Sequence, residues 1–225
     1  MGSALHWWWW FIPAFAGLGY FALTVFVLEL FNYWGFTAKT GAKGAEQRDD
    51  LKRAAIKKLP WAPYVPTPHI AVSKMLEMGR IEPGDVVFDL GCGDGRIVRR
   101  AAKEYEATGV GFELSFAVYW YARFLNLWHR VSVDRVKLLR ADFWQSDLAQ
   151  CDVVMAFLLP RLLDQLREKA IEEMRPGSRI VTFRWEMPGW VPQKRDFVAA
   201  GFTGTSGAKL TPVYVYEAPF KRRTA

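Results

Sequence analysis

Beyond about residue 60, short apolar runs alternate with longer stretches in which apolar residues recur every three or four positions. The short runs are typical of strands buried on both faces of a parallel sheet, at residues 86–90, 108–112, 136–139, 152–159 and 179–185. The longer stretches are typical of helices packed on such a sheet, at residues 96–105, 115–130 and 160–174. Thr67 is placed to cap a further helix that ends at Met78. This alternation predicts a doubly wound α/β sheet.

The last part of this region has weaker patterns. Val191–Ala200 is predicted to form a final helix, and Phe202–Ala208 a strand that pairs with Val213–Glu217. In a doubly wound sheet the ligand binds beyond the carboxyl ends of the strands. Residues that bind a ligand are therefore expected directly after the predicted strands.

The N-terminal segment differs, because residues 7–28 form a run of 22 residues without a charge. At about 1.5 Å rise per residue, a helix of that length spans a bilayer core of roughly 30 Å. Tryptophans at positions 7–10, and Tyr33 with Trp34, match the aromatic belts of a spanning helix. The first six residues contain no Lys or Arg, unlike a cleaved signal peptide. We therefore predict one transmembrane helix over residues 7–28.

Positive charge is concentrated directly after this segment. Seven basic and three acidic residues between positions 37 and 58 contribute +4 to the formal net charge of +7. This stretch either lies along anionic headgroups or forms a solvated linker helix. The positive-inside rule places the N-terminus outside and the rest of the chain in the cytoplasm. The predicted organisation is a membrane anchor over residues 1–36, a basic linker over residues 37–59 and one globular domain over residues 60–225.

Two cysteines, Cys92 and Cys151, provide neither a disulfide framework nor zinc-ligand spacing. The three histidines, His6, His69 and His129, also lack metal-ligand spacing. We therefore expect no metal site and a reducing compartment.

Glycine is concentrated between the first predicted strand and the helix that follows, in Asp89–Gly95. Glycines at positions 91, 93 and 95 allow a backbone turn to approach a ligand closely ahead of a helix N-terminus. The spacing differs from the dinucleotide-binding G-x-G-x-x-G turn, because Arg96 stands where the last glycine would be. Asp89 would repel a pyrophosphate but suits a ligand with a cationic ammonium group. S-adenosylmethionine carries such a group beside its sulfonium.

Two further acids follow the next two predicted strands. Glu113 ends the second strand, where a carboxylate can accept hydrogen bonds from both hydroxyls of a ribose. Asp142 follows the third strand, where it can accept a hydrogen bond from the amino group of adenine. Acids in unrelated surface loops would not show this order, so the sequence predicts that S-adenosylmethionine is the cofactor.

Four stretches connect the chain with a known family: Tyr64–Pro68, Val87–Ile97, Phe157–Pro160 and Arg184–Trp190. Together they resemble the class I, seven-strand methyltransferases, and within them the protein-lysine methyltransferases of archaea and mitochondria. The mitochondrial members act on the ATP synthase c-subunit and the adenine nucleotide translocase, and they carry an N-terminal hydrophobic segment. The resemblance implies a Rossmann-like sheet of seven strands and a segment at residues 64–68 that closes over the cofactor. Trp185–Met187 departs from the family's fifth-strand ending.

The resemblance and the strand endings together indicate a set of expected site residues. Those expected to bind the cofactor are Tyr64, Pro66, Thr67, Asp89, Gly91, Cys92, Gly93, Asp94, Gly95, Glu113, Leu114, Asp142 and Phe143. Aromatic residues expected to form a poorly hydrated pocket for the methyl acceptor are Tyr64, Phe157, Trp185 and Trp190. Plain core packing is the alternative role for each of these four. Glu186 is a weaker candidate for orienting an ammonium group, and His69 is expected at the surface.

These features predict a protein-lysine N-methyltransferase that acts on a membrane protein at the cytoplasmic face. The main alternative is methylation of a small lipid-soluble molecule, such as a quinone or a phospholipid amine. Enzymes that methylate adenine or glutamine usually have Asn or Asp with Pro-Pro-Tyr after the fourth strand, where this chain has Leu158–Pro160. Nucleic acid is a weaker alternative because residues 60–225 carry only +4 and no long basic stripe. A non-catalytic scaffold is the last alternative.

Overall fold

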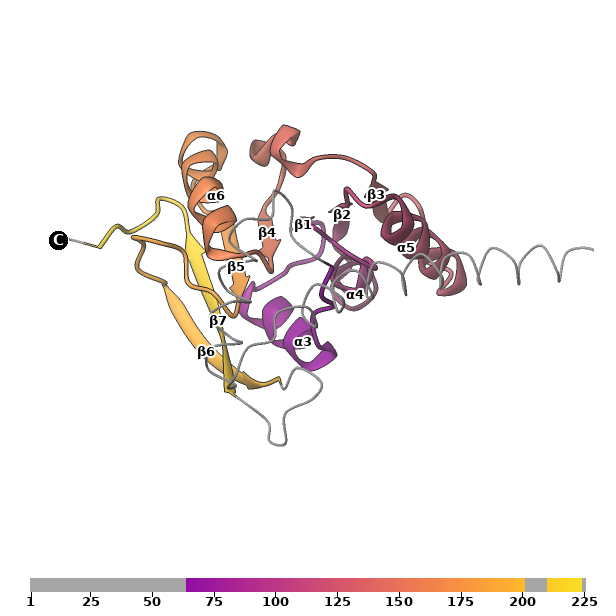
Figure 1. The fold of residues 1–225 in the computed structure, drawn as a ribbon, viewed down its shortest axis with the longest axis horizontal. Helices are drawn as coiled ribbons and strands as arrows, with labels where there is room; N and C mark the ends of the chain where they lie inside the picture. The colour runs from indigo at the N-terminus through magenta and orange to yellow at the C-terminus, as the bar shows by residue number, and fades with distance from the viewer. Residues whose placement is uncertain (1–63, 201–209, 224–225) are drawn as a thin grey trace, which may run out of the picture. The chain divides into compact units, whose positions relative to one another are not determined.

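A computed structural model describes residues 64–200 and 210–223, and in these residues seven strands form one sheet (Figure 1). The strands are β1 (Val86–Leu90), β2 (Thr108–Phe112), β3 (Val136–Leu139), β4 (Val153–Ala156), β5 (Arg179–Phe183), β6 (Lys194–Ala199) and β7 (Leu210–Glu217). The helices are α3 (His69–Met78), α4 (Arg96–Glu104), α5 (Phe116–Trp128) and α6 (Pro160–Glu173). Short 3₁₀ turns follow β3 at Phe143–Gln145 and Leu148–Gln150.

The strand order in the sheet is β3-β2-β1-β4-β5-β7-β6. Strands β1 to β5 are parallel, whereas β7 runs antiparallel to both β5 and β6. The chain therefore moves outward from β1 to β3 and then returns to the other side of β1. That change of direction creates the switch point beside β1 where doubly wound sheets bind ligands.

Alternate residues of each strand face opposite helical layers. Val87, Met155 and Val181 pack in a cluster with α3 and α4, while Phe88 and Ile180 pack in a cluster with α6 on the other face. This two-face burial explains why β1, β2, β4 and β5 contain few polar residues, whereas β3 alternates between buried and exposed residues. A smaller cluster joins α4, α5 and β3 through Val98, Ala122, Val136 and Leu138.

Two glycines of β2 allow α4 and the loop before it to lie close to the sheet. A Cβ atom built on Gly109 would lie 2.7 Å from Cβ of Val98 in α4. A Cβ atom on Gly111 would lie 2.7 Å from Sγ of Cys92 in the loop after β1. Neither distance is compatible with a side chain, so β2 needs glycine at both positions to seat the loop at its observed depth.

Most of the predicted elements agree with the structure. The strands predicted at residues 86–90, 108–112 and 136–139 have these bounds, and the helices after β1, β2 and β4 end within two residues of their predicted ends. The fourth and fifth strands are shorter than predicted, because the chain leaves the sheet after Ala156 and Phe183.

The helix predicted over Val191–Ala200 is wrong, because Lys194–Ala199 forms edge strand β6. Strand β6 pairs with β7, which contains the predicted strand Val213–Glu217. The segment Phe202–Ala208, predicted as the partner of that strand, lies outside the described residues. Edge strands usually carry charged and exposed residues, which obscure the alternation of apolar and polar positions that is typical of a strand. In this segment only Val198 and, just beyond the strand, Ala200 are buried. Hydrogen bonds with β7 determine the conformation of this segment.

The cap predicted at Thr67 is also wrong. Pro68 directly precedes α3, and no side chain caps the helix. Thr67 is buried instead, and its carbonyl accepts a hydrogen bond from Nη1 of Arg96 at 2.8 Å.

The predicted anchor at residues 7–28, the basic linker and the segment at residues 202–208 lie outside the described residues. Within residues 64–200 and 210–223, none of the helices combines the length and the apolar character needed to cross a membrane.

Candidate functional site

The loop between β1 and α4, residues 91–95, contains three glycines in left-handed backbone conformations. We call it the glycine loop. Gly91, Gly93 and Gly95 have φ angles of +79°, +56° and +74°. The N–H groups of Gly91 and Cys92 both donate to the carbonyl of Phe112 at the end of β2, at 3.0 and 2.9 Å. These bonds fix the loop against the neighbouring strand. Residues other than glycine rarely adopt such angles, which explains the G-x-G-x-G spacing.

The ring of Tyr64 lies directly on this loop. A Cβ atom at Gly93 would lie 2.4 Å from Cε2 of Tyr64, so the ring occupies the space a side chain would need. Burial and the nearby Asp94 carboxylate raise the pKa of the Tyr64 hydroxyl. Tyr64, expected from the sequence to belong to the site, is therefore neutral and in contact with the glycine loop at physiological pH.

Arg96 joins the segment before α3 to the loop. Its Nε and Nη2 atoms donate to both carboxylate oxygens of Asp94, at 2.6 to 3.0 Å, while Nη1 donates to the carbonyl of Thr67. The side chain also hydrogen-bonds Tyr64. Bidentate pairing of this kind fixes geometry as well as charge. The carboxylate of Asp94, which was expected to contact the cofactor, is thus paired with Arg96. Through its bond to Thr67, the same arginine holds residues 64–67 against the loop.

Arg99 supports the loop from inside the domain. Its guanidinium is buried and donates to the carbonyl of Asp94 and to Oδ1 of Asn126, the latter at 3.3 Å. Burial lowers the pKa of this group. No sequence pattern indicated this role, because arginines on the first turns of a helix are usually solvent-exposed. For Arg96 there was an indication, since it stands where a dinucleotide-binding turn would have its last glycine.

Asp89 is the most unusual polar group of the site. It is 3% exposed, and its Oδ2 atom has no hydrogen-bond partner. Burial, followed by the negative charges of Asp94 and Glu113, raises the pKa of this carboxyl to about 8. A buried carboxylate without a partner is costly, and a cation bound beside it would remove the cost.

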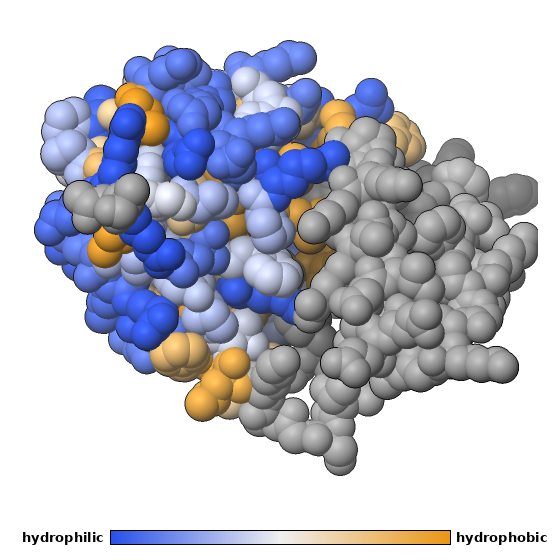
Figure 2. Space-filling view, turned by 60° about the vertical axis from the view of Figure 1, so that its left-hand side comes forward, coloured by the Kyte–Doolittle hydropathy of each residue, from blue (hydrophilic) through white to orange (hydrophobic). Residues whose placement is uncertain are grey.

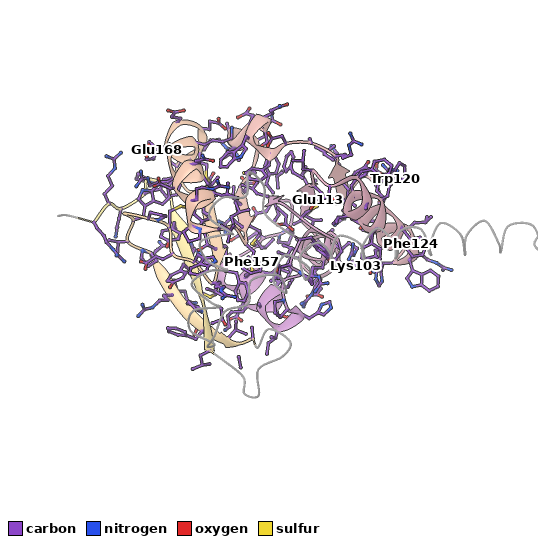
Figure 3. The ribbon with its side chains drawn as sticks, viewed as in Figure 1. Lys103, Glu113, Trp120, Phe124, Phe157 and Glu168 are labelled. Carbon is purple, nitrogen blue, oxygen red and sulfur yellow. The ribbon has the colours of Figure 1, made fainter. Side chains whose placement is uncertain are left out.

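Glu113 lies beyond β2 with its carboxylate on the glycine loop, near the centre of the molecule in Figure 3. Oε2 accepts a hydrogen bond from the Gly93 N–H at 3.0 Å, and Oε1 accepts one from the Ser115 N–H at 2.9 Å. These two bonds fix the orientation of the carboxylate. The carboxylate is therefore held directly after β2, where the sequence predicted a contact with the ribose.

Asp142 begins the turn after β3. Its Oδ1 atom accepts from the Trp144 N–H at 3.1 Å and caps the 3₁₀ turn at Phe143–Gln145. The Phe143 and Trp144 rings lie 4.6 Å apart and are partly buried. Asp142 and Phe143 therefore lie in a turn shortly after β3, the position at which the sequence predicted a contact with adenine.

The other expected cofactor residues differ in their surroundings. Cys92 directs its side chain into the cluster between α4, α5 and β3, and burial raises the pKa of its thiol. Only the backbone of Cys92 is therefore suited to ligand binding. Pro66 and Leu114 are exposed, and 63% of Leu114 is accessible.

The aromatic residues expected around the methyl acceptor are not all at one place. Phe157 and Phe183 follow or end adjacent strands, and their rings meet edge to face with centroids 5.0 Å apart. Trp185 is partly buried, with the Arg184 guanidinium 5.2 Å from its ring centre. These two candidates, Phe157 and Trp185, belong to the carboxyl ends of β4 and β5.

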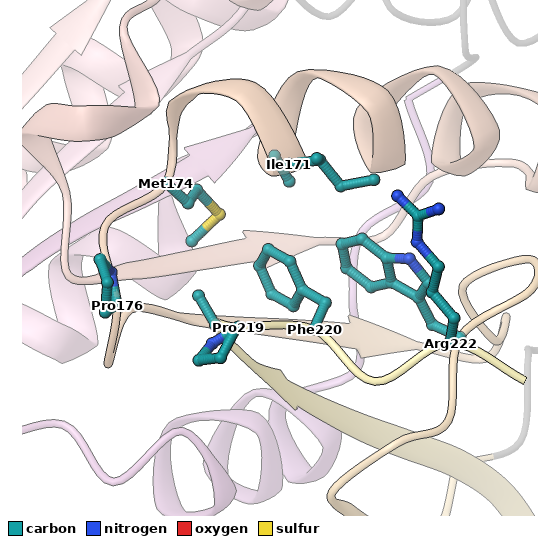
Figure 4. Close-up of a pocket in the computed structure, with 9 residues that line it drawn as sticks. Ile171, Met174, Pro176, Pro219, Phe220 and Arg222 are labelled. Atoms are coloured by element: carbon teal, nitrogen blue, oxygen red, sulfur yellow. The ribbon is translucent and has the colours of Figure 1, made fainter.

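Trp190 lies in the core near α6. It is 1% exposed and stacks on Phe220 with ring centroids 3.9 Å apart. Both rings line a pocket of about 250 Å³ between α6 and the C-terminal segment, together with Met174 and Pro219 (Figure 4). The glycine loop takes no part in lining this pocket, and the geometry supports core packing as the role of Trp190.

The two weaker candidates from the sequence lie outside this arrangement. Glu186 forms an ion pair with Arg223, and His69 is exposed at the start of α3.

The fit of S-adenosylmethionine to the site can be judged from these features. The buried, unpartnered Oδ2 atom of Asp89 suits the ammonium group, while Glu113 and Asp142 follow the next two strands as the ribose and base require. Glycine at positions 91, 93 and 95 allows the left-handed backbone of the loop and a close approach of a ligand to its N–H groups. The residues present therefore fit this cofactor.

Comparison with known proteins agrees with this fit. The ANTKMT methyltransferase domain family matches residues 89–194. A protein-lysine N-methyltransferase of Saccharolobus islandicus (strain REY15A) is 36% identical over 137 residues, which cover 60% of this chain and 84% of that protein. The ATP synthase c-subunit lysine N-methyltransferase of Xenopus laevis is 36% identical over 131 residues, 58% of this chain and 56% of that protein.

Among solved structures, an RNA methyltransferase from Salinibacter ruber in complex with S-adenosyl-L-homocysteine has a TM-score of 0.59 and 33% identity. The similarity covers 68% of this chain and 93% of that one. A putative tRNA methyltransferase of Streptococcus pneumoniae, at 10% identity and a TM-score of 0.55, shows the same fold. The chain is therefore an S-adenosylmethionine-dependent methyltransferase and belongs to the family that contains the Saccharolobus protein-lysine N-methyltransferase.

Proposed function

We propose that this enzyme methylates lysine side chains of a membrane protein at the cytoplasmic face of the membrane. The observation that carries the acceptor class is the 36% identity with the Saccharolobus protein-lysine N-methyltransferase over 84% of that protein. Relatives named for the ATP synthase c-subunit and for adenine nucleotide translocase support a membrane-protein substrate. The chain spans a little over half of these two relatives, so their substrates are a guide to acceptor class rather than identity.

The reaction is an in-line displacement at a methyl carbon. The bound cofactor supplies an electrophilic methyl group on a sulfonium. The ε-amine forms a new N–C bond as the S–C bond breaks, and the electron pair of that bond stays on sulfur. A lysine ammonium must first lose a proton to water, since its ordinary pKa is about 10.4. The protein's task is to align the two partners and exclude water.

Particular residues of the chain fit these tasks. Asp89 would hold the amino group of the cofactor, and Glu113 and Asp142 its ribose and base. Tyr64, kept on the glycine loop by Arg96, shields the loop from solvent. Phe157 and Trp185 lie just after β4 and β5, where they can provide an apolar surface that favours a neutral amine over an ammonium.

RNA is a second candidate acceptor, because the Salinibacter structure that resembles this chain is named as an RNA methyltransferase. Leu158–Pro160 at the end of β4 argues against methylation of an adenine amino group. Leu158 is 4% exposed and belongs to the core, so no polar side chain from this position reaches the site.

The acceptor can be identified by the fate of a labelled methyl group. Full-length protein is incubated with membranes, total RNA or extracted lipid, together with methyl-labelled S-adenosylmethionine. Label on a protein band, with methyl-lysine after hydrolysis, supports the proposal. Label that ribonuclease releases, or that partitions into organic solvent, overturns it. An Asp89→Asn variant is the matched control for cofactor-dependent transfer.

The membrane location is a separate part of the proposal. It rests on the uncharged run at residues 7–28 and on the basic residues that follow it. Alkaline carbonate should leave the full chain in the membrane pellet, and a protease added to the outside of intact cells should spare residues 60–225. Release by carbonate, or digestion of that region from outside, contradicts this location while leaving the lysine specificity untouched.

A further inference from the structure

Helix α5 carries a surface unlike that of the other helices. Only Val118 and Ala122 are buried, whereas aromatic or aliphatic side chains at i, i+4, i+8 and i+11 or i+12 are exposed. These exposed residues are Phe116, Trp120, Phe124, Leu127 and Trp128. Trp120 and Phe124 extend from α5 at the outer side of the described domain (Figure 3). We call this row of side chains the aromatic stripe.

The side chains of the stripe contact one another and are well exposed, so they are not isolated apolar residues. Phe116 and Trp120 contact each other edge to face, with centroids 6.2 Å apart, and Phe124 and Trp128 lie 6.1 Å apart. Leu127 and Trp128 are 78% and 71% exposed, which leaves most of each side chain in water. A continuous exposed apolar surface of this kind is unusual for a soluble domain and marks an interaction site.

Basic residues border the stripe. The Arg123 guanidinium lies 5.8 Å from the Trp120 ring centre, and the Arg140 guanidinium lies 5.5 Å from that of Phe116. Helix α5 itself contains no acid. Over residues 114–140 the chain has one acid, Asp134, and five basic residues, namely Arg123, Arg130, Arg135, Lys137 and Arg140.

Helix α6 shows that packing against the sheet does not require such a surface. It buries Leu162, Leu163, Leu166 and Ala170, while charges of both signs occupy its outer side. The face of the described residues in Figure 2, which includes the left-hand side of Figure 1, is mostly hydrophilic with scattered apolar residues. Among the helices of the described residues, α5 is therefore the one that exposes such a row of aromatic side chains.

We propose that the aromatic stripe of α5 binds the interfacial region of an anionic lipid bilayer. Tryptophan, phenylalanine and leucine on one side of a helix, flanked by arginine and lysine, form the combination that inserts among headgroups. Tryptophan is preferred at that depth. Anionic headgroups complement the basic border, and the uncharged run at residues 7–28 independently predicts that this chain is at a membrane.

Other occupants fit these observations less well. A second copy of the chain would bring two basic borders together across a two-fold axis, and like charges repel. Binding of nucleic acid relies on a continuous basic groove that follows the phosphates, whereas the most exposed member of the stripe, Leu127, is aliphatic and cannot stack on bases. The inference goes beyond the proposed function, because it requires no particular methyl acceptor.

The test uses the full chain reconstituted into vesicles, with an environment-sensitive fluorophore on a single introduced cysteine. The native cysteines Cys92 and Cys151 are both buried, so an exposed cysteine can be labelled selectively. Leu127→Cys reports on the stripe. Glu168→Cys reports on the hydrophilic outer side of α6 and is the matched control, also visible in Figure 3.

With vesicles of phosphatidylcholine and phosphatidylglycerol, emission at position 127 should shift to the blue and lose quenching by iodide, while emission at position 168 should not change. Combining the label with Arg123→Gln and Arg130→Gln, or using pure phosphatidylcholine, should reduce the shift. The inference is overturned by equal emission at both positions, by a shift that follows protein concentration without lipid, or by a shift that only RNA produces. Labelled-methyl transfer, measured on the same samples, reports on the proposed function separately.

Discussion

The region of the glycine loop and the region around Trp190 differ in whether their buried polar groups are hydrogen-bonded. Near Trp190 these groups are hydrogen-bonded, since the Tyr216 hydroxyl accepts from the Met187 N–H at 2.8 Å and the Thr182 hydroxyl donates to the Trp185 carbonyl at 2.7 Å. In the loop region, Asp89 Oδ2 is buried without a partner. The first region therefore stabilises the fold, while the second retains an electrostatic cost that a bound cation removes.

The contrast predicts that substitutions in the two regions separate stability from cofactor binding. The largest effect is expected for Trp190→Ala. Loss of the buried indole and its stacking on Phe220 should lower the free energy of unfolding by about 3–5 kcal/mol. Denaturant unfolding measures this loss. Calorimetry at low temperature should show that the folded fraction binds S-adenosylmethionine as tightly as the wild type.

A different outcome would indicate that Trp190 belongs to the functional site. If Trp190→Ala weakened cofactor binding or raised the KM for the acceptor while stability was retained, the aromatic-pocket role expected from the sequence would hold.

Asp89→Asn should have the next largest effect, on affinity instead of stability. Removing a charge-assisted interaction of roughly 1.5–3 kcal/mol corresponds to a loss of about 10- to 150-fold in affinity for S-adenosylmethionine. Calorimetric titration gives the affinity, and a melting temperature at pH 7 that is no lower than the wild-type value shows that the variant is folded. Unchanged affinity would remove Asp89 from the site.

The pH dependence of stability provides a further contrast. The folded-state pKa of Asp89, about 8, lies above the ordinary value of an aspartate, so the folded state binds more protons than the unfolded state. The contribution of Asp89 to stability is therefore fully present below about pH 4 and is lost as the pH rises through about 8. Melting curves of the cofactor-free protein should favour Asp89→Asn over the wild type increasingly from pH 5 to pH 9. A constant difference would mean that Asp89 is not buried as described.

The smallest effect is expected from adding one methyl group to the loop. Gly93→Ala and Gly84→Ala both place alanine at a positive φ angle, at a cost of about 1 kcal/mol each. Space differs between them, because nothing lies within 4 Å of a Cβ at Gly84, whereas the Tyr64 ring occupies that space at Gly93. We expect Gly93→Ala to lose more stability than Gly84→Ala, because its methyl group must displace the Tyr64 ring, and we expect only Gly93→Ala to weaken cofactor binding in calorimetry. Equal cofactor binding by both variants would contradict a role of the Tyr64 contact in binding.

The parallel half of the sheet and the order of its acids could be predicted from the sequence because the information is local. Burial on both faces leaves β1, β2 and β4 with few polar residues, and the candidate cofactor residues come directly after β1, β2 and β3. The antiparallel edge could not be predicted in the same way. Strand β6 exposes Lys194 and Phe197, and its pairing with β7 determines its conformation more than its own weak apolar pattern does.

The candidate site also contains some residues that could be predicted from the sequence and others that could not. Asp89 and the glycines could be recognised from their position after a strand. The position of Arg96 after the glycines was an indication, but its contact with Thr67 and the contact of Arg99 with Asn126 could not be predicted, because only the folded chain creates them. Burial of the Trp190 ring beneath α6 likewise depends on the C-terminal segment that returns to it.

Proton release on cofactor binding reports directly on the role of Asp89. At pH 6.5 its carboxyl is mostly protonated in the cofactor-free enzyme, and the ammonium group should displace that proton. Calorimetric titration of the full chain with S-adenosylmethionine, in buffers of different ionisation enthalpy, should give release of about one proton for the wild type and almost none for Asp89→Asn. Heats that do not depend on the buffer, or equal proton release from both proteins, would show that this carboxylate does not receive the ammonium group.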